Sequence, residues 1–401
     1  MPTAIDIDSV FRQLKSRGYC LWVGAGIGVH AASAGNEKVP TWAALAENLE
    51  LAAELDHQSD LSLPERLDLV LHALGRERFQ RELRERIYDP LARSLLEAAR
   101  TCGKNQSDPI PREVRQLARL GARANPIVNF NVEPMTSLLL GGAEPHAIRC
   151  FVPPVPGGSS LLSGVGHRTQ SERFNRSIYH PHGAVTVSGI CVMTASEYRA
   201  MRGTLALQLA VHAAFQTDLV IVGMSLDDDY LREQLACFRD QVPFVWWFTV
   251  DAPRPDVEKW CLVNRIAVVR PESWSAFWEA VEVKLPTPEH LSIANNWLFT
   301  VSEASSVLSG HAHHAHILSE FRKLGSTEAE LVGWKRALEM RGYPIPEVHE
   351  EASLEPFPPH DAEVLAPILR YMWSLRFGAA RSPSQGPPAS NPKGGGSVGG
   401  S

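Results

Sequence analysis

The sequence has no paired cysteines. Its six cysteines stand singly, and none belongs to a Cys-x-x-Cys pair: Cys20, Cys102, Cys150, Cys191, Cys237 and Cys261. Zinc ribbons and the disulfide frameworks of small secreted domains are recognised by such spacing. We therefore expect neither of them, and single cysteines favour a reducing compartment.

An excess of positive charge is also missing. The 39 Lys and Arg residues are outnumbered by 45 Asp and Glu residues, which gives a net charge of −6. A chain without a basic field has no general attraction for nucleic acid or for an anionic membrane surface. We expect no direct nucleic-acid binding, so any response to nucleic acid would need a partner that makes the contact.

Long apolar runs are absent too. No segment reaches the roughly 18 apolar residues that a membrane-spanning helix needs. Residues 1–18 contain acidic side chains and lack the apolar stretch of a secretory signal. These features predict a cytoplasmic protein that is not bound to a membrane.

The sequence does have a regular alternation of short apolar segments with helical patterns. Strands are expected at 19–23, 126–130, 177–180, 218–222, 243–250 and 265–269. Helices are expected at 6–17, 112–121, 196–215, 227–240, 255–262 and 274–283. Such alternation indicates βαβ units and a parallel sheet that is covered by helices on both faces. The predicted fold class is α/β, with a doubly wound, Rossmann-like and mostly parallel sheet over residues 1–285.

Two segments interrupt the alternation. Residues 41–100 show helical periodicity almost throughout, with breaks expected at Pro64 and Pro90, and predict a helical insertion after the first strand. Residues 141–176 are richer in Gly, Pro and Ser and predict a loop or a small excursion before the strand at 177–180.

The C-terminal part has a different composition. Residues 286–378 are mostly helical and apolar, which is consistent with an oligomerisation or partner-docking region and equally with a cap over the sheet. Residues 379–401 are rich in Ser, Pro and Gly, cannot bury a core, and predict a disordered tail.

Candidate functional residues lie where the predicted strands end. In doubly wound sheets, ligands bind at the carboxyl ends of the strands. Four of these ends carry glycines or polar residues: Gly24-Ala25-Gly26, Asn129–Glu133, His180–Gly183 and Gly223–Asp228. Taken singly, each has an ordinary structural alternative, respectively a tight turn, a helix-capping asparagine, a structural histidine and a helix N-cap.

The glycine turn differs from the dinucleotide fingerprint of Rossmann oxidoreductases. Glycines between a strand and a helix let the backbone approach a phosphate, and the helix offers free N–H groups to it. Val29 stands where the last glycine of that fingerprint would be, and a long helical segment replaces the expected second strand with its acidic residue. An oxidoreductase is therefore the weaker interpretation.

Taken in order, the four motifs resemble the sirtuin superfamily, specifically its bacterial sirtuin-like NAD-consuming branch. Gly24-Ala25-Gly26 matches that family's GAG turn, which contacts NAD. Pro40, followed by Thr41 and Trp42, resembles the branch's aliphatic-Pro-x-Trp element on the nicotinamide side. The resemblance places the catalytic asparagine at Asn131 and the catalytic histidine at His182.

The same resemblance assigns the remaining positions. Asn129 and Glu133 flank the catalytic asparagine, in place of the family's usual Thr and Asp, and are expected to contact NAD. Gly223, Ser225 and Asp228 resemble the element near the adenosine end. Residues 194–198 resemble the Thr-x-x-x-Tyr that commonly follows the histidine motif.

The resemblance implies an NAD+ hydrolase that releases ADP-ribose and nicotinamide. Asn131 would hold the ribose hydroxyls or the attacking water, and His182, with an ordinary pKa near ~6.5, would act as a base or a ribose anchor. NAD+ is then a substrate, and no metal is expected. A non-catalytic NAD or ADP-ribose sensor is the alternative. Protein deacylation is weaker because the zinc-ribbon cysteines are missing.

The resemblance also implies a role in bacterial antiphage defence by NAD depletion, or abortive infection. An enzyme of this kind has to be silent in healthy cells, which favours control within a homo-oligomer or a partner complex. The family context offers a HerA-type ATPase, a short Argonaute or no partner, and the sequence does not choose between them.

Two further features have ordinary explanations. The segment His311–His316 places histidines three residues apart, which would suit a metal on one helix face, but no carboxylate or cysteine accompanies them. We favour a solvated surface there. Trp246 and Trp247 are expected in the sheet core, facing helices on opposite sides.

Overall fold

The computed structural model describes most of the chain. The described residues are 6–57, 60–104, 108–141, 147–151, 162–164, 177–183, 193–201, 217–309 and 359–377. The histidine segment at 311–316 and the tail at 379–401 lie outside them, so the predictions for both stay predictions.

The centre of the fold is an eight-stranded sheet with the order β4-β3-β5-β2-β1-β6-β7-β8. Neighbouring strands run parallel except for β4, which is antiparallel to β3. The strands are β1 Tyr19–Val23, β2 Ala124–Asn129, β3 Ala147–Phe151, β4 Leu162–Gly164, β5 Ser177–His180, β6 Leu219–Val222, β7 Val245–Phe248 and β8 Ala267–Val269. The predicted α/β class with a mostly parallel, Rossmann-like sheet is confirmed.

Strands β3 and β4 correct the sequence prediction of a loop over residues 141–176. β3 pairs along its length with β5, and β4 pairs with β3. The backbone hydrogen bonds of β3 therefore come from a strand much later in the chain. A local excess of Gly, Pro and Ser does not reveal such a partner.

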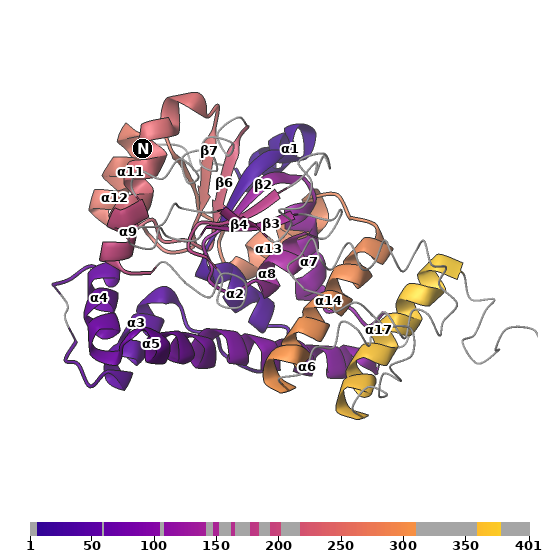
Figure 1. The fold of residues 1–401 in the computed structure, drawn as a ribbon. Coiled ribbons are helices and arrows are strands. Elements are labelled where there is room, and N and C mark those ends of the chain that lie inside the picture. Colours follow the sequence, from indigo (N-terminus) through magenta and orange to yellow (C-terminus); the bar gives the residue numbers. More distant parts are fainter. Residues whose placement is uncertain are drawn as a thin grey trace, which may run out of the picture.

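The described helices surround this sheet (Figure 1). They are α1 Ile7–Arg17, α2 Ala25–Ala32, α3 Trp42–Ala52, α4 Leu63–Leu74, α5 Arg76–Leu83, α6 Asp89–Gly103, α7 Arg112–Ala122, α8 Met135–Leu140, α9 Ala195–Met201, α11 Asp229–Phe238, α12 Pro255–Val263, α13 Trp274–Lys284, α14 His290–Ser309 and α17 Pro359–Phe377. The expected break at Pro64 is confirmed, because this proline lies in the first turn of α4. The expected break at Pro90 is wrong.

The chain continues helically through Pro90. A π-helical turn, Arg84–Tyr88, joins α5 to α6, and Pro90 lies in the first turn of α6. Pro90 has no N–H for the regular helical ladder, and it follows directly on the π-helical turn, where that ladder is already interrupted.

Side chains alternate between the two faces of the sheet. Trp246 packs into the larger core, on the side of α1 and α13, whereas Trp247 packs into the core under α11 and α12. Both tryptophans are buried, and Figure 1 shows these helix groups on opposite sides of the strands. The prediction for this pair is confirmed, and it reflects the double coverage that parallel sheets require.

The C-terminal helices pack on the helical insertion. α14 lies against α6 and α8, and α17 lies against both α6 and α14 (Figure 1). Trp297 is fully buried and donates its indole N–H to the carbonyl of Pro109 at 3.2 Å. Apolar residues of α14 and α17 belong to the same core as the sheet. Intramolecular packing therefore covers one face of both α14 and α17, while the proposed role of residues 286–378 in oligomerisation and the boundary near residue 285 stay predictions.

No helix among the described residues is both long and apolar enough to cross a membrane.

Candidate active site

The strand order reverses at β1. The chain proceeds from β1 outward to β2 and β5, and then returns to the other side of β1 with β6. The carboxyl ends of β1 and β6 therefore lie side by side where the order reverses, which is the usual ligand position in doubly wound sheets. The glycine turn after β1 and the segment Gly223–Asp228 after β6 meet at this point.

Close backbone contact explains the glycines at this junction. Gly26 donates its N–H to the carbonyl of Gly223 at 3.1 Å, and Gly24 donates to Val222 at 3.1 Å. A Cβ atom on Gly26 would lie 2.7 Å from the Gly223 Cα, and one on Gly24 would lie 2.6 Å from the Gly223 oxygen. Gly223 itself has a φ of +71°. The sequence interpretation invoked only the approach of a phosphate, whereas packing between two strand ends already requires these glycines.

Gly28, two residues further along α2, is different. A Cβ atom on Gly28 would meet no atom within 4 Å, so there is open space beside this residue. The predicted contact between the glycine turn and NAD stays a prediction.

Asn131 connects the end of β2 to the glycine turn. Its side-chain Nδ2 donates to the carbonyl oxygen of Gly24 at 3.1 Å, and the residue is 6% exposed. The predicted catalytic asparagine thus lies at the carboxyl edge, beside the predicted phosphate-contacting turn. Its amide is oriented by the backbone of that turn.

Asn129 and Glu133 lie beneath this edge, with their side chains engaged with α8. Asn129 donates to Thr136 Oγ1 at 3.0 Å and to Ser137 Oγ at 2.8 Å. Glu133 accepts from the backbone N–H of Thr136 at 3.0 Å and from the hydroxyl of the same residue. Burial raises the pKa of Glu133 to about 7. The structure accounts for both side chains by their bonds to α8, and the predicted contact with NAD stays a prediction.

His182 follows β5 and has a well-defined tautomer. Its Nδ1 lies 3.1 Å from the carbonyl oxygen of Phe130. A carbonyl only accepts hydrogen bonds, so Nδ1 carries the proton and Nε2 is left as an acceptor. Within the described part of the chain, Nε2 is buried and has no hydrogen-bond partner. Burial lowers the pKa of His182 to about 4, so the ring is neutral at pH 7.

Aromatic rings surround the imidazole of His182. The ring centroids of Trp42, Phe130 and Tyr198 lie 6.2, 5.3 and 5.1 Å from it. Trp42 is the first residue of α3, after the N-cap Thr41, and Pro40 lies half-buried just before them. The aliphatic-Pro-x-Trp element is therefore adjacent to the predicted catalytic histidine through its tryptophan.

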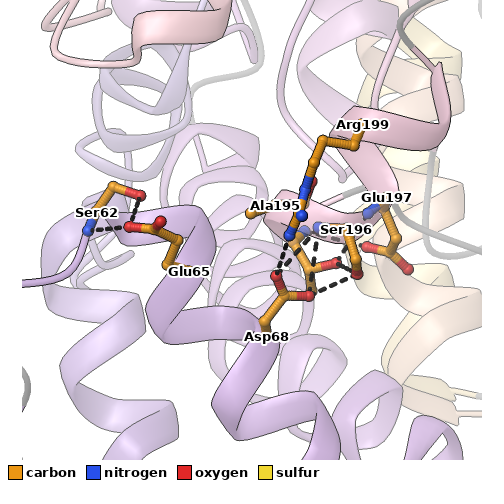
Figure 2. Close-up of polar contacts among 8 residues, drawn as sticks. Ser62, Glu65, Asp68, Ala195, Ser196, Glu197 and Arg199 are labelled. Carbon is orange, nitrogen blue, oxygen red and sulfur yellow. Dashed lines mark hydrogen bonds and ion pairs between the residues drawn. The ribbon is translucent and has the colours of Figure 1, made fainter.

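The insertion helices that carry Trp42 are fastened to α9, which carries Tyr198. Asp68 on α4 accepts hydrogen bonds from the Ser196 hydroxyl at 2.6 Å and from the Ser196 backbone N–H at 3.1 Å (Figure 2). Arg76 at the start of α5 pairs with Glu197 at 2.5 Å. These bonds join the insertion to the helix that carries Tyr198, on the side of His182 where both rings lie.

A small core lies under the same helices. Val132 and Met193 contribute to it from the segments that flank Asn131 and α9. The insertion supplies the rest: Leu45, Ala46, Leu49, Leu67, Val70, Phe79 and Leu83. The insertion is therefore packed directly against the end of β2 that carries Asn131.

At the end of β6, the helix-capping interpretation accounts for the described contacts. Asp228 accepts from the backbone N–H of Leu231 at 3.3 Å at the start of α11. Ser225 is exposed and accepts from the N–H of Asp227 at 3.4 Å. Contact of Ser225 and Asp228 with the adenosine part of NAD stays a prediction.

Comparison with known families finds a match for one segment of this chain. Residues 158–266 match the family model of the SIR2-like domain, so this part of the chain is similar to that domain. The matched segment contains His182 and Gly223–Asp228, and the sheet places Gly24 and Asn131 directly beside it. No curated protein matches the chain.

A SIR2-like domain indicates an NAD-dependent enzyme of some kind. Among the described residues, no group of three or more His, Cys, Asp or Glu side chains could hold a metal ion. Cys150 and Cys191 have no described side chains, so the expectation that the domain lacks a zinc ribbon rests on the cysteine spacing.

The sequence interpretation assigned no separate role to His180, which the structure bonds to Asn131. This residue ends β5 and is fully buried. Its Nδ1 lies 3.0 Å from the carbonyl oxygen of Asn131, and its Nε2 lies 2.8 Å from Ser137 Oγ. The sequence contains one indication of this role: His180 precedes His182 of the His-Gly motif by two residues, so both histidines lie at the end of the same strand.

Proposed function

We propose that the protein hydrolyses the nicotinamide–ribose bond of NAD+ and releases ADP-ribose, nicotinamide and a proton. The observation that carries this proposal is the state of His182. Its Nε2 is a neutral, buried acceptor without a partner among the described residues, beside the strand end that bears Asn131. Burying an acceptor without a hydrogen-bond partner costs free energy, and a ligand that donates a hydrogen bond to it removes this cost.

The chemistry suits a neutral histidine. Glycosidic cleavage passes through an oxocarbenium-like state, with positive charge growing on the ribose, and nicotinamide leaves as a neutral molecule. The leaving group therefore needs no strong acid. A neutral imidazole does not repel the cationic nicotinamide ring, and its lone pair stabilises a hydroxyl or water that becomes more acidic as charge develops.

The lowered pKa distinguishes two roles for His182. A base that keeps the proton works best with a pKa near the operating pH. Because burial lowers the pKa of His182 to about 4, the free protein offers a weak base. We therefore assign His182 the role of ribose anchor and hydrogen-bond acceptor, with the proton passing on to solvent.

Asn131 is assigned to the ribose hydroxyls or the attacking water. Its Nδ2 is committed to the Gly24 carbonyl, which fixes the plane of the amide, and its Oδ1 is the acceptor that we assign to the substrate side. Gly24, Ala25 and Gly26 are proposed to lie along the pyrophosphate, with Pro40 at the nicotinamide end.

The rest of NAD+ is assigned to neighbouring segments. Gly223, Ser225 and Asp228 are proposed at the adenosine end, where β6 meets the glycine turn. Beside the predicted contact with NAD, Asn129 is proposed to fix Asn131 by accepting its backbone N–H, and Glu133 to fix the start of α8.

The test is incubation of the purified full chain with NAD+, followed by chromatography of the products. Nicotinamide and ADP-ribose are expected in equal amounts. NADH formation would instead indicate an oxidoreductase, intact bound NAD+ a sensor, and deacetylation of an acetyl-lysine peptide a deacylase. His182→Ala and Asn131→Ala are expected to abolish cleavage while the fold is kept. Cleavage by His182→Ala at the wild-type rate would contradict the assignment.

We further propose that this activity serves bacterial antiphage defence by NAD depletion and is controlled by assembly of the chain with itself or with a HerA-type ATPase or short Argonaute. The resemblance supports this role. Cellular NAD after phage challenge, compared between wild type and Asn131→Ala, tests it. Light scattering should use the full chain, because removing residues after 285 would expose core residues that pack against α14.

A further inference from the structure

Two histidines of one strand end bind two successive carbonyls of the neighbouring strand end. His182 donates its Nδ1 proton to the carbonyl of Phe130, and His180 bonds through Nδ1 to the carbonyl of Asn131. β2 ends at Asn129, so neither carbonyl belongs to a residue of that strand. Beyond the end of β2, these two carbonyls are therefore bonded by side chains of β5 and its turn, and not by the backbone of a neighbouring strand. The predicted catalytic asparagine lies at this point.

The tautomer of His180 follows from its partners. The Asn131 carbonyl only accepts, so Nδ1 is protonated and Nε2 is an acceptor. Ser137 Oγ, 2.8 Å away, must then donate to Nε2, and it accepts in turn from Asn129 Nδ2 at 2.8 Å. Burial lowers the pKa of His180 to about 4, in keeping with a neutral ring. The bonds form a directed chain from Asn129 through Ser137 and His180 to Asn131.

A second path closes this chain. Asn129 Oδ1 accepts the backbone N–H of Asn131 at 2.9 Å. The N–H and the carbonyl of Asn131 are thus both held by side chains, and its Nδ2 is held by Gly24 at 3.1 Å. Three separate strand ends fix one residue, and all of the participating side chains are buried. Closed polar networks of this kind restrict a segment to one arrangement.

We propose that His180 is the positioning residue for Asn131, acting by donation from Nδ1 to the Asn131 carbonyl, with Ser137 and Asn129 setting its tautomer. The proposal rests on the proposed function, since it gives Asn131 a catalytic role. His180 does not touch the substrate in this assignment. Its effect on the reaction is entirely through the orientation of the neighbouring strand end.

A matched pair of substitutions separates this role from general support of the fold. In His180→Asn, the side-chain amide nitrogen occupies the position of Nδ1 and keeps the donor to Asn131, but it does not reach Ser137. In His180→Gln, the amide lies near the position of Nε2, so contact with Ser137 is kept and the donor to Asn131 is lost. Both variants carry a side-chain amide, but His180→Asn keeps the bond to Asn131 and His180→Gln keeps the bond to Ser137.

His180→Asn is expected to keep kcat within about 3-fold of wild type. His180→Gln is expected to lose kcat by about 30-fold or more with KM within 2-fold, because small displacements of a catalytic group cost on the order of 10²-fold in rate. His30→Asn is the control. His30 is also largely buried, bonds Gln116 at 3.1 Å and stacks on Trp278, away from the strand ends. It is expected to lower the melting temperature without changing kcat.

Equal kcat values for His180→Asn and His180→Gln would overturn the proposal, whether both are active or both inactive. If neither variant folds, Ser137→Ala tests the same chain with the loss of one oxygen. It removes the second hydrogen bond that holds the His180 ring, which weakens the placement of Nδ1 against the Asn131 carbonyl, and is expected to lower kcat several-fold at unchanged KM. Wild-type kcat in this variant would equally overturn the proposal.

Failure of the proposed function is separable from failure of this inference. If the wild-type chain leaves NAD+ intact, the NADase proposal fails, and amide hydrogen exchange of residues 130–133 still tests the positioning role. Faster exchange in His180→Gln than in His180→Asn is expected. Equal exchange in the two variants would contradict the role of the Nδ1 bond.

Discussion

Gly26 and Gly223 lie so close that a Cβ atom on Gly26 would come within 2.7 Å of the Gly223 Cα. This contact joins the turn after β1 to the end of β6, where the strand order reverses. Gly28, two residues further along α2, has open space where its Cβ would be. Two glycines of the same segment thus have opposite tolerance for a methyl group.

Gly26→Ala is expected to lower the free energy of unfolding by about 1–3 kcal/mol, because the new methyl group forces backbone apart in a packed junction. Gly28→Ala serves as the matched control. It is expected to raise the free energy of unfolding by up to about 1 kcal/mol, since alanine favours the helix over glycine. Urea unfolding of both variants measures the difference. A Gly26→Ala variant as stable as Gly28→Ala would contradict the contact.

The neutral state of His182 predicts a pH profile. Protonation of Nε2 removes the acceptor that we assign to the substrate, and burial places the pKa of this group at about 4. The value of kcat/KM for NAD+ is therefore expected to be level between pH 6 and 8 and to fall only below about pH 5. An acid limb centred near pH 6.5, the ordinary value for histidine, would show that the ring is not desolvated in the free protein.

The sheet could be predicted from the sequence because its central strands are short apolar runs that end in glycine or polar residues. β1 and β6 illustrate this, since each is buried along its whole length and stops at a glycine. β3 was not predicted because it is short, contains Arg149 and borders a segment rich in Gly, Pro and Ser, so no continuous apolar run marks it.

The candidate site could be predicted in outline for a similar reason. Parallel strands bring their carboxyl ends to one edge, so Asn131 and His182 were expected to be neighbours. The direction of each side chain beyond a strand end depends on the turn that follows. Asn129 and Glu133 turn toward α8 and bond Thr136. His180 bonds Ser137 of the same helix. The spacing of these residues in the sequence does not predict such contacts.

Glu133 predicts a pH dependence of stability. Burial raises the pKa of its carboxyl from 4.5 to about 7. A raised folded-state pKa means that the contribution to stability is fully present below pH 4.5 and is lost as the pH rises through about 7. Glu133→Gln lacks this titration. The difference in unfolding free energy, variant minus wild type, is expected to increase by about 3 kcal/mol between pH 5 and 8.

Urea unfolding of wild type and Glu133→Gln at a series of pH values measures that change. Glu65→Gln is the control, because Glu65 lies at the exposed start of α4 and has a lowered pKa. Its difference from wild type is not expected to grow above pH 5. A constant difference for Glu133→Gln across the same range would mean that Glu133 is ionised in the folded protein throughout.

Trp42 packs beside His182, and its removal is expected to expose the histidine and move its pKa. The largest cause of the low pKa of His182 is burial, and the Trp42 ring closes one side at a centroid distance of 6.2 Å. Trp42→Ala is expected to admit water and raise this pKa toward 6.5, so that the acid limb of kcat/KM moves up by about one pH unit or more. Trp42→Phe keeps an aromatic ring over His182 and is expected to leave the limb near pH 4. The predicted effect is a shift of the acid limb to higher pH. If Trp42→Ala instead lowered kcat/KM equally at every pH, Trp42 would not act by keeping water from His182.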